Sequence, residues 1–209
     1  NENVGGTISI NGVEYSNFPS NIIITDLTNI EAISSEGYEF DYWELSSGTL
    51  ENENNQSINL YIDENATLTA YFSPIEVQIT FDISHNNGGL IRINDSLLNN
   101  LPQTLNLTYG ETFNINIELN DNFNFNFWNS PEELIENEND YNFNLFIEES
   151  GYIIANLIEL LSLTLIIEPE DAGYVLGNGE EMEVFPLSQT YTQNTQIDLQ
   201  AFATNGMEF

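Results

Sequence analysis

Gly37-Tyr38-Glu39-Phe40-Asp41-Tyr42-Trp43 is the most informative stretch of this chain, because its pattern returns at a fixed interval. The first four residues recur as Asn122-Phe123-Asn124-Phe125 and as Gly206-Met207-Glu208-Phe209, so that Phe40, Phe125 and Phe209 lie 85 and 84 residues apart. The two tryptophans of the chain, Trp43 and Trp128, are also 85 residues apart. Self-similarity at a fixed period is the signature of a repeat protein.

Further landmarks keep the same period. Gly6-Thr7-Ile8 corresponds to Gly89-Leu90-Ile91 and to Gly173-Tyr174-Val175, at steps of 83 and 84 residues. The segments Leu68–Phe72 and Ile153–Leu157 also correspond. We therefore predict a tandem array of modules of about 84 residues. The predicted bounds are 1–73 (opening strand missing), 74–158 (complete) and 159–209 (ending before the tryptophan position).

The complete middle copy reads as a series of β-strands. Val77–Ile83 alternates apolar and polar residues, which is typical of a half-buried strand. The turn residues Asn86-Asn87-Gly88-Gly89 then lead into Leu90–Ile93, and together they predict a hairpin. Further strands are predicted at Leu105–Leu107, Phe113–Leu119, Phe123–Trp128, Phe143–Phe146 and Tyr152–Leu157. Pro131–Glu136 is either one short helix or an acidic loop.

The charge excludes many functions. The chain has 34 Asp and Glu residues against the single cation Arg92, giving a formal net charge of -33. Nucleic-acid binding and attachment to anionic lipid both need clustered Lys and Arg, so neither is expected. The absence of lysine and cysteine from the sequence removes P-loop, Schiff-base, thiolate and disulfide chemistry. No long apolar span or signal peptide is present in these residues, and no membrane insertion of this segment is expected.

The apolar content is nevertheless high enough for a folded core. Hydrophobic residues make up 41% and aromatic residues 12% of the chain. Its 32 Asn residues disfavour long helices, while the interleaved Ile, Phe, Tyr and Thr residues favour strands. The expected fold class is all-β.

The aromatic strand suggests a structural role first and a ligand-binding role second. Glycine at position 37 or 206 permits the turn into the strand, and period two would place Tyr38, Phe40 and Tyr42 on one face and Trp43 on the other. Recurrence of the aromatic residues favours a core role. The alternative is a strip of Phe123, Phe125, Phe127 and Trp128 on which sugars could stack.

Taken together, Gly5-Gly6-Thr7-Ile8, Ile30-Glu31-Ala32, Gly37–Trp43 and Asn65–Phe72 resemble the divergent InlB B-repeat, a bacterial repeat domain related to the Listeria–Bacteroides repeat. The third copy shares Leu199-Gln200-Ala201 and Gly206–Phe209, whereas the second has Asn122 for the glycine and Ile117 for the alanine. The resemblance implies a small β-rich module, either β-grasp-like or a β-sandwich, in a large secreted or surface-anchored protein. It carries no catalytic residues.

From the resemblance and the repetition we expect a structural segment of an extracellular stalk, adhesin or filament, with neighbouring repeats or identical subunits as partners. The alternative is a carbohydrate- or protein-binding accessory module that contacts a glycan or a surface protein. An enzyme is not expected: the single histidine, His85, adjoins the Asn86–Gly89 turn without a nucleophile motif.

Acidic clusters raise the question of a metal. Carboxylate and amide oxygens suit calcium, and Asp63, Glu64, Glu170 and Asp171 are the candidates. None of these clusters has the spacing of an EF-hand loop, so solvated loops are the favoured interpretation and no cofactor is required. In the third copy, an unclosed sheet would need strands from chain beyond Phe209 or from a neighbouring subunit.

Overall fold

The computed structural model describes residues 5–131, 134–182, 184–204, 206 and 208. Throughout these residues the regular secondary structure is β-strand, and the predicted all-β class is confirmed. Pro131 and residues 134–136 form bends and irregular chain, so they show no helix; Glu132 and Glu133 of the suggested helix lie outside the described residues. Proline and two neighbouring acids suit a first helical turn, but no apolar periodicity follows to stabilise one.

The described residues pack into two compact units. The first comprises the described residues up to 78 together with 106–112 and 146–150; the second comprises 79–105, 113–145 and the described residues from 151 onward. This division follows packing, whereas the predicted repeats follow sequence. The repeat bounds 1–73, 74–158 and 159–209 therefore stay a prediction.

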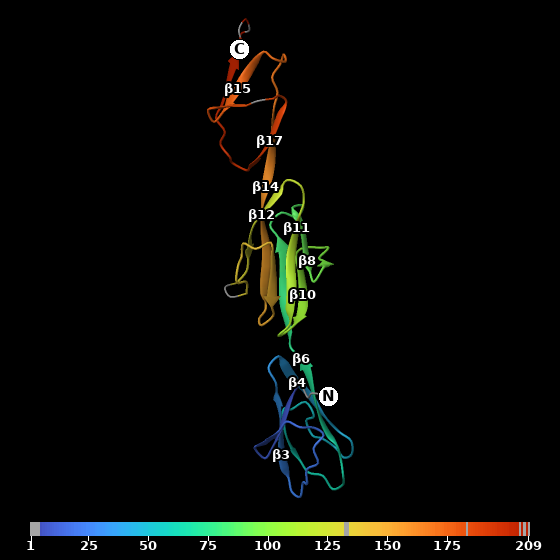
Figure 1. The fold of residues 1–209 in the computed structure, drawn as a ribbon. Coiled ribbons are helices and arrows are strands. Elements are labelled where there is room, and N and C mark those ends of the chain that lie inside the picture. The colour runs from blue at the N-terminus through green and yellow to red at the C-terminus, as the bar shows by residue number, and fades with distance from the viewer. Residues whose placement is uncertain (1–4, 132–133, 183, 205, 207, 209) are drawn as a thin grey trace. The chain divides into compact units, whose positions relative to one another are not determined.

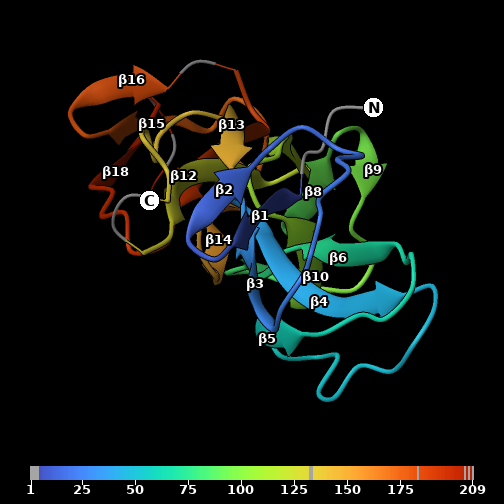
Figure 2. The same cartoon turned by 90° about the horizontal axis from the view of Figure 1, so that it is seen from below.

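The first repeat forms two sheets from six strands. They are β1 (Gly6–Ile10), β2 (Val13–Tyr15), β3 (Thr28–Ser34), β4 (Tyr38–Leu45), β5 (Ser57–Leu60) and β6 (Leu68–Pro74). One sheet has the order β2-β1-β3-β5, and the other pairs β4 with β6 in antiparallel fashion. Figure 2 shows β4 and β6 side by side. Trp43 on β4 shares one core with Ile30 and Ala32 on β3 and with Ile58 and Leu60 on β5, so the inner faces of the two sheets pack together.

The second repeat builds the same plan with more strands. They are β7 (Glu76–Ile83), β8 (Gly89–Ile93), β9 (Ser96–Leu97), β10 (Gln103–Thr108), β11 (Thr112–Leu119), β12 (Phe123–Asn129), β13 (Asn142–Phe146) and β14 (Gly151–Leu165). One sheet has the order β10-β7-β14-β12 and the other the order β13-β11-β8-β9. The opening strand β7 runs parallel to β14, while β12 is antiparallel to it.

The alternating pattern of the sequence explains which side chains fill this core. Ile79, Phe81 and Ile83 of β7 are buried, as are Ile115 and Ile117 of β11. Burying one such side chain typically stabilises the fold by about 1.5–3 kcal/mol. A two-sheet arrangement that encloses these side chains corresponds to the sandwich alternative.

The predicted hairpin between Val77–Ile83 and Leu90–Ile93 is wrong. Both segments are strands, but β7 pairs with β10 and β14, whereas β8 pairs with β9 and β11. The Asn86–Gly89 segment therefore carries the chain from one sheet to the other. A Cβ on Gly89 would lie 2.4 Å from the Glu118 carbonyl oxygen, so this glycine is needed for close strand approach rather than for a hairpin turn.

The third repeat contributes β15 (Gly173–Gly177), β16 (Glu180–Met182), β17 (Leu187–Thr192) and β18 (Leu199–Ala203). β15 lies between β16 and β18, and β17 pairs with the second half of β14. Within the described residues no further strand closes these sheets. The prediction that closing strands come from elsewhere remains a prediction.

β14 is a single strand of 15 residues that belongs to two repeats (Figure 1). Its first half pairs with β7 and β12 of the second repeat, and its second half, Leu160–Leu165, pairs with β17 of the third. The corresponding passage between the first and second repeats is interrupted at Ile75, between β6 and β7.

Candidate functional site

The glycine that opens the aromatic strand has a left-handed backbone. Gly37 has φ +78°, and Gly206 has φ +93°. In the second repeat Asn122 takes the same place, with φ 70°. Asn can replace glycine here because it adopts the left-handed backbone region more readily than most residues do. Met207 and Phe209 of the third copy lie outside the described residues.

Both tryptophans are buried and hydrogen-bonded. Trp43 and Trp128 are 1% and 0% exposed. The indole Nε1 of Trp43 donates to the Asn55 carbonyl oxygen at 3.0 Å, and that of Trp128 donates to the Asp140 carbonyl oxygen at 2.8 Å. Each ring thus fills a core and satisfies its polar atom in the same way. Neither indole ring is accessible for stacking against a ligand.

The predicted faces of the aromatic strand need a correction. A bulge between Phe40 and Tyr42 shifts the β4–β6 register, so strict period two fails there. Phe40 and Trp43 pack together with ring centroids 5.3 Å apart, whereas Tyr42 is 41% exposed. The second repeat has a bulge at the same place, between Phe125 and Phe127. The residue inserted by the bulge brings the tryptophan onto the core face.

Tyr42 instead forms an exposed ring pair. It stacks on Tyr71 of β6 with centroids 4.6 Å apart and an interplanar angle of 16°. The Tyr71 hydroxyl donates to the Glu44 carboxylate at 2.7 Å, which raises the pKa of Tyr71 above its ordinary 10.0. A similar pair, Tyr174 and Phe202, stacks across β15 and β18 at 11°. These cross-strand pairs stabilise the outer faces of the sheets.

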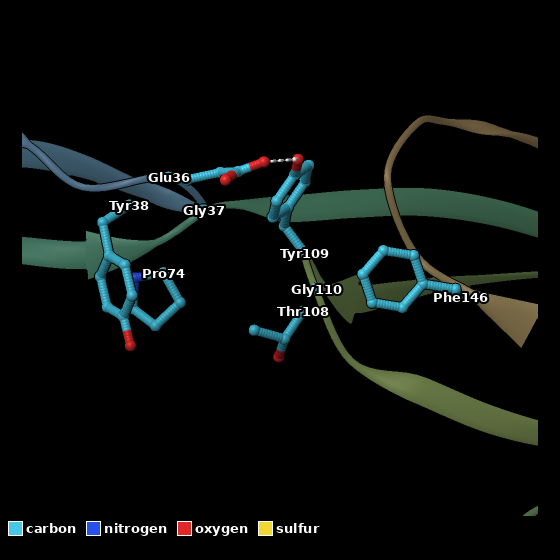
Figure 3. A pocket seen from close by; sticks show the side chains of 8 residues that line it. All are labelled: Glu36, Gly37, Tyr38, Pro74, Thr108, Tyr109, Gly110 and Phe146. Carbon is cyan, nitrogen blue, oxygen red and sulfur yellow. Dashed lines mark hydrogen bonds between the residues drawn. The ribbon is translucent and has the colours of Figure 1, made fainter. Parts of the chain in front are cut away.

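One pocket of about 280 Å³ lies within the first unit (Figure 3). Its lining combines aromatic rings, a proline and a carboxylate, from Glu36, Gly37, Tyr38, Pro74, Thr108, Tyr109, Gly110 and Phe146. Figure 3 shows the Tyr38 and Pro74 rings at one side of the pocket and the Phe146 ring at the other. Phe146 is 49% exposed, so part of an aromatic ring is open to solvent here.

The Glu36 carboxylate and the Tyr109 hydroxyl are joined in this pocket. Tyr109 donates to Glu36 Oε1 at 3.0 Å, and this hydrogen bond raises the pKa of the Tyr109 hydroxyl above 10.0. The Tyr109 ring also lies against Gly37, where a Cβ would be 2.8 Å from Tyr109 Cδ1. Glu36 keeps a second carboxylate oxygen for which the structure shows no protein donor among the described residues, so it could accept a hydroxyl from a ligand.

The single arginine is committed to a surface ion pair. Arg92 Nε and Nη2 donate to the two carboxylate oxygens of Glu118 at 2.5 and 3.2 Å, and Nη1 donates to the Asp95 carbonyl oxygen at 3.0 Å. The hydrogen bonds from Arg92 lower the pKa of the Glu118 carboxyl below its ordinary value. The pair spans β8 and β11 and thereby reinforces their pairing.

The calcium candidates do not converge. Glu64 accepts a hydrogen bond from the Ser47 hydroxyl, and the Asp171 carbonyl oxygen accepts one from Thr204. Among the described residues no three His, Cys, Asp or Glu side chains lie close enough together to hold a metal ion. Asp63, Glu64, Glu170 and Asp171 thus lie in loops without a shared geometry.

His85 lies beside Ser84, whose hydroxyl is 3.0 Å from Nδ1. Within the described residues His85 has no hydrogen bond to a carboxylate, and its ring packs on Phe123 with centroids 5.6 Å apart. The Ser84 oxygen accepts the main-chain N–H of Leu157 at 2.9 Å. The Ser84 hydrogen bond joins the end of β7 to β14, and the His85 ring contact joins it to β12.

A recurring asparagine is the structural feature that our sequence analysis missed. Asn11, Asn94 and Asn178 open the two-residue turns after β1, β8 and β15, with φ of 48°, 45° and 51°. Each forms one hydrogen bond through its main chain and one through its side chain, Asn11 with Asn29 of β3, Asn94 with Asn114 of β11, and Asn178 with Asp198, the residue before β18. Asn-Gly at positions 11 and 178 is a hairpin signal that could have revealed these turns. The pocket lined by Tyr109 and Phe146 has no comparable signal in the sequence, because the segments that form it are distant from one another along the chain.

The fold therefore defines a small all-β repeat module with a buried tryptophan and a positive-φ residue before the aromatic strand. Residues 1–76 match the family model of the divergent InlB B-repeat domain, which confirms the predicted resemblance for the first repeat. Neither a curated protein nor a solved structure matches the chain significantly. No helix of the described residues is long and apolar enough to cross a membrane.

Proposed function

We propose that this chain is a structural segment of a bacterial surface or secreted protein, in which repeats form a stalk or an adhesive filament. The observation that carries the proposal is β14. A strand that pairs first with β7 and β12 and then with β17 transmits tension from one repeat to the next through main-chain hydrogen bonds. A flexible linker between the second and third repeats would not do so.

The charge supports an array that is exposed to water. With a net charge of -33, like-charged surfaces repel and lateral aggregation is suppressed. The family match over residues 1–76 supports a bacterial surface or secreted location, because that is where such repeat domains typically occur. We also propose that the chain is not an enzyme, because its single histidine, His85, packs on Phe123 and has no hydrogen bond to a carboxylate among the described residues.

Two experiments test the proposal. Antibodies raised against this segment should label intact cells of the source organism, and protease treatment of intact cells should remove the label; labelling only after permeabilisation would contradict the location.

In the second experiment the 209-residue chain is pulled by its ends in optical tweezers. Leu160→Pro removes the Leu160 N–H donor to the Asn122 oxygen, at 2.7 Å, and should lower the unfolding force. Pro74→Ala, at the last residue of β6, is the matched control.

A second candidate function is a carbohydrate-binding module, favoured by the pocket of Glu36, Tyr38, Tyr109 and Phe146. Aromatic faces and a carboxylate are the groups that bind sugar C–H bonds and hydroxyls. Phe146→Ala should abolish binding on a glycan array, and Tyr141→Ala, an exposed tyrosine of the second unit, should not. A glycan array without hits for the unmodified chain would remove this candidate.

A further inference from the structure

The walls of the pocket in the first unit are tied to one another by main-chain hydrogen bonds. Ile75 donates its N–H to the Gly37 carbonyl oxygen at 2.8 Å and accepts the Tyr109 N–H at 3.0 Å. The neighbouring Gly110 N–H donates to the Ile147 carbonyl oxygen at 2.7 Å. The segments that supply the lining are thereby held in place without a ligand, as in a preformed binding site.

The side chains in this pocket suit a cation. Tyr38, Tyr109 and Phe146 supply aromatic rings, and Glu36 supplies a carboxylate. The negative face of an aromatic ring attracts an ammonium group that lies within about 6 Å of the ring centroid. The Tyr109 hydroxyl donates to Glu36 at 3.0 Å, and this bond polarises the Tyr109 ring in the direction that favours a cation (Figure 3).

The charges around the pocket favour a cation that comes from another molecule. The hydrogen bond to Glu36 is the largest cause of the raised pKa of Tyr109, and the carboxylate of Glu148 adds to it, so two negative charges act on this hydroxyl. The chain has no lysine, and its single arginine, Arg92, is engaged by Glu118. A second copy of this chain therefore offers no free Lys or Arg side chain.

We propose that this pocket binds the ammonium group of a lysine side chain from a partner protein. Sites for drug-sized ligands measure roughly 300–1,000 Å³, so a pocket of about 280 Å³ is matched to one side chain. Tyr109 already occupies one oxygen of Glu36, which leaves the other for a single ammonium N–H and disfavours the bidentate pairing that arginine prefers.

The surface around the pocket admits such a side chain. Phe146 is 49% exposed and Glu36 is also exposed, so a lysine carried on another protein reaches both groups from solvent. A net charge of -33 attracts basic partners before they make contact. Lysine binding here is independent of the proposed stalk role, and it competes with the carbohydrate candidate for the same pocket.

Peptide titrations of the 209-residue chain test this site. The probe is acetyl-Gly-Lys-Gly-amide, which is compared with the same peptide carrying an Nε-acetylated lysine and with the same peptide carrying arginine. Binding is followed by the NMR shifts of the Gly37 and Gly110 main-chain N–H groups, which belong to the pocket lining. The free diamine putrescine and the neutral sugar cellotriose are titrated in the same way.

Two variants and one control separate the pocket from the general negative charge. Phe146→Leu keeps an apolar side chain but removes the ring, and Glu36→Gln removes the charge but keeps an acceptor for Tyr109. Glu39→Gln removes the same charge from an exposed position of β4 outside the pocket lining.

We expect the lysine peptide to shift both N–H groups and the acetylated peptide to shift neither. The Kd of the lysine peptide should rise about threefold in Phe146→Leu and in Glu36→Gln, and it should stay unchanged in Glu39→Gln.

Equal shifts from the lysine and acetylated peptides would overturn the cation site, as would equal affinities in Glu36→Gln and Glu39→Gln. Tighter binding of the arginine peptide would overturn the choice of lysine, and tighter binding of putrescine would overturn a partner protein as the source. Shifts from cellotriose without shifts from the lysine peptide would overturn the proposal in favour of the carbohydrate candidate.

Discussion

Asn94 and Asn114 are joined by two hydrogen bonds. The Asn94 main-chain N–H donates to the Asn114 carbonyl oxygen at 2.9 Å, and the Asn114 main-chain N–H donates to Asn94 Oδ1 at 2.8 Å. The side chain of a turn residue thereby completes the ladder between β8 and β11 at the point where β8 turns away. The same two bonds join Asn178 and Asp198, at 2.8 and 3.0 Å.

Asn94→Ala should destabilise the second repeat by about 1–2 kcal/mol, because it removes one hydrogen bond and leaves alanine at a φ of 45°. Asn94→Gly should cost less, since glycine accepts this backbone angle and only the hydrogen bond is lost. Urea unfolding followed by tryptophan fluorescence measures both. Equal stability of all three chains would show that the side-chain bond contributes nothing.

Trp128→Ala should lower the stability of the second repeat by ~3–5 kcal/mol, since it empties a fully buried site and removes the bond to the Asp140 oxygen. The variant leaves Trp43 as the single tryptophan, so that fluorescence reports the first repeat alone. We expect that signal to melt close to its original temperature. Tyr152→Ala, at an exposed site, is the control. A joint shift of both repeats would disprove their independence.

Glu118→Gln should remove a contribution to stability that depends on pH. The Glu118 pKa is lowered in the folded chain, so the ionised carboxylate favours folding. The contribution is complete above the unfolded pKa of 4.5 and is lost as the pH falls through the lower folded value. The stability difference between the unmodified chain and Glu118→Gln, measured from pH ~7 to ~3, should therefore shrink towards acid pH. A difference that stays constant would refute the assignment.

The melting temperature should rise with added NaCl. With 34 acids and one arginine, most carboxylates have counterions as their compensation, and repulsion grows as the screening length increases from ~8 Å at 0.15 M towards ~30 Å at 0.01 M salt. Millimolar calcium at matched ionic strength should add a smaller increment through weak loop binding. A large calcium-specific increase that EDTA reverses would instead show an ordered metal site at residues such as Asp63 or Glu170.

The sequence predicted strands better than their pairing. The alternation in Val77–Ile83 gives the strand and its buried face, because burial of one face requires period two. Alternation does not say which strand lies beside it, and the expected partner at Leu90–Ile93 belongs to the other sheet. The hairpin turn was predicted at Asn86–Gly89, but it lies elsewhere. Asn94 and Asp95, which both have positive φ, form the turn between the paired strands β8 and β9.

The candidate site was less predictable than the fold. The burial of Trp43 could be predicted because the tryptophan recurs in the second repeat. The bulge that places Trp43 beside Phe40 has no marker in the sequence, because the extra residue of a bulge can be recognised only when the partner strand is known. The pocket brings Glu36 next to Tyr109, 73 residues away, and no local pattern encodes that contact.

The continuity of β14 limits how such an array can change its length. Side chains alternate between the two faces of a strand, so inserting one residue between Leu157 and Leu160 would turn every later side chain of β14 to the opposite face. Two inserted residues would restore the alternation. Where repeats share a strand in this way, the spacing between them should therefore vary by even numbers of residues, whereas the interruption at Ile75 allows odd changes between the first and second repeats.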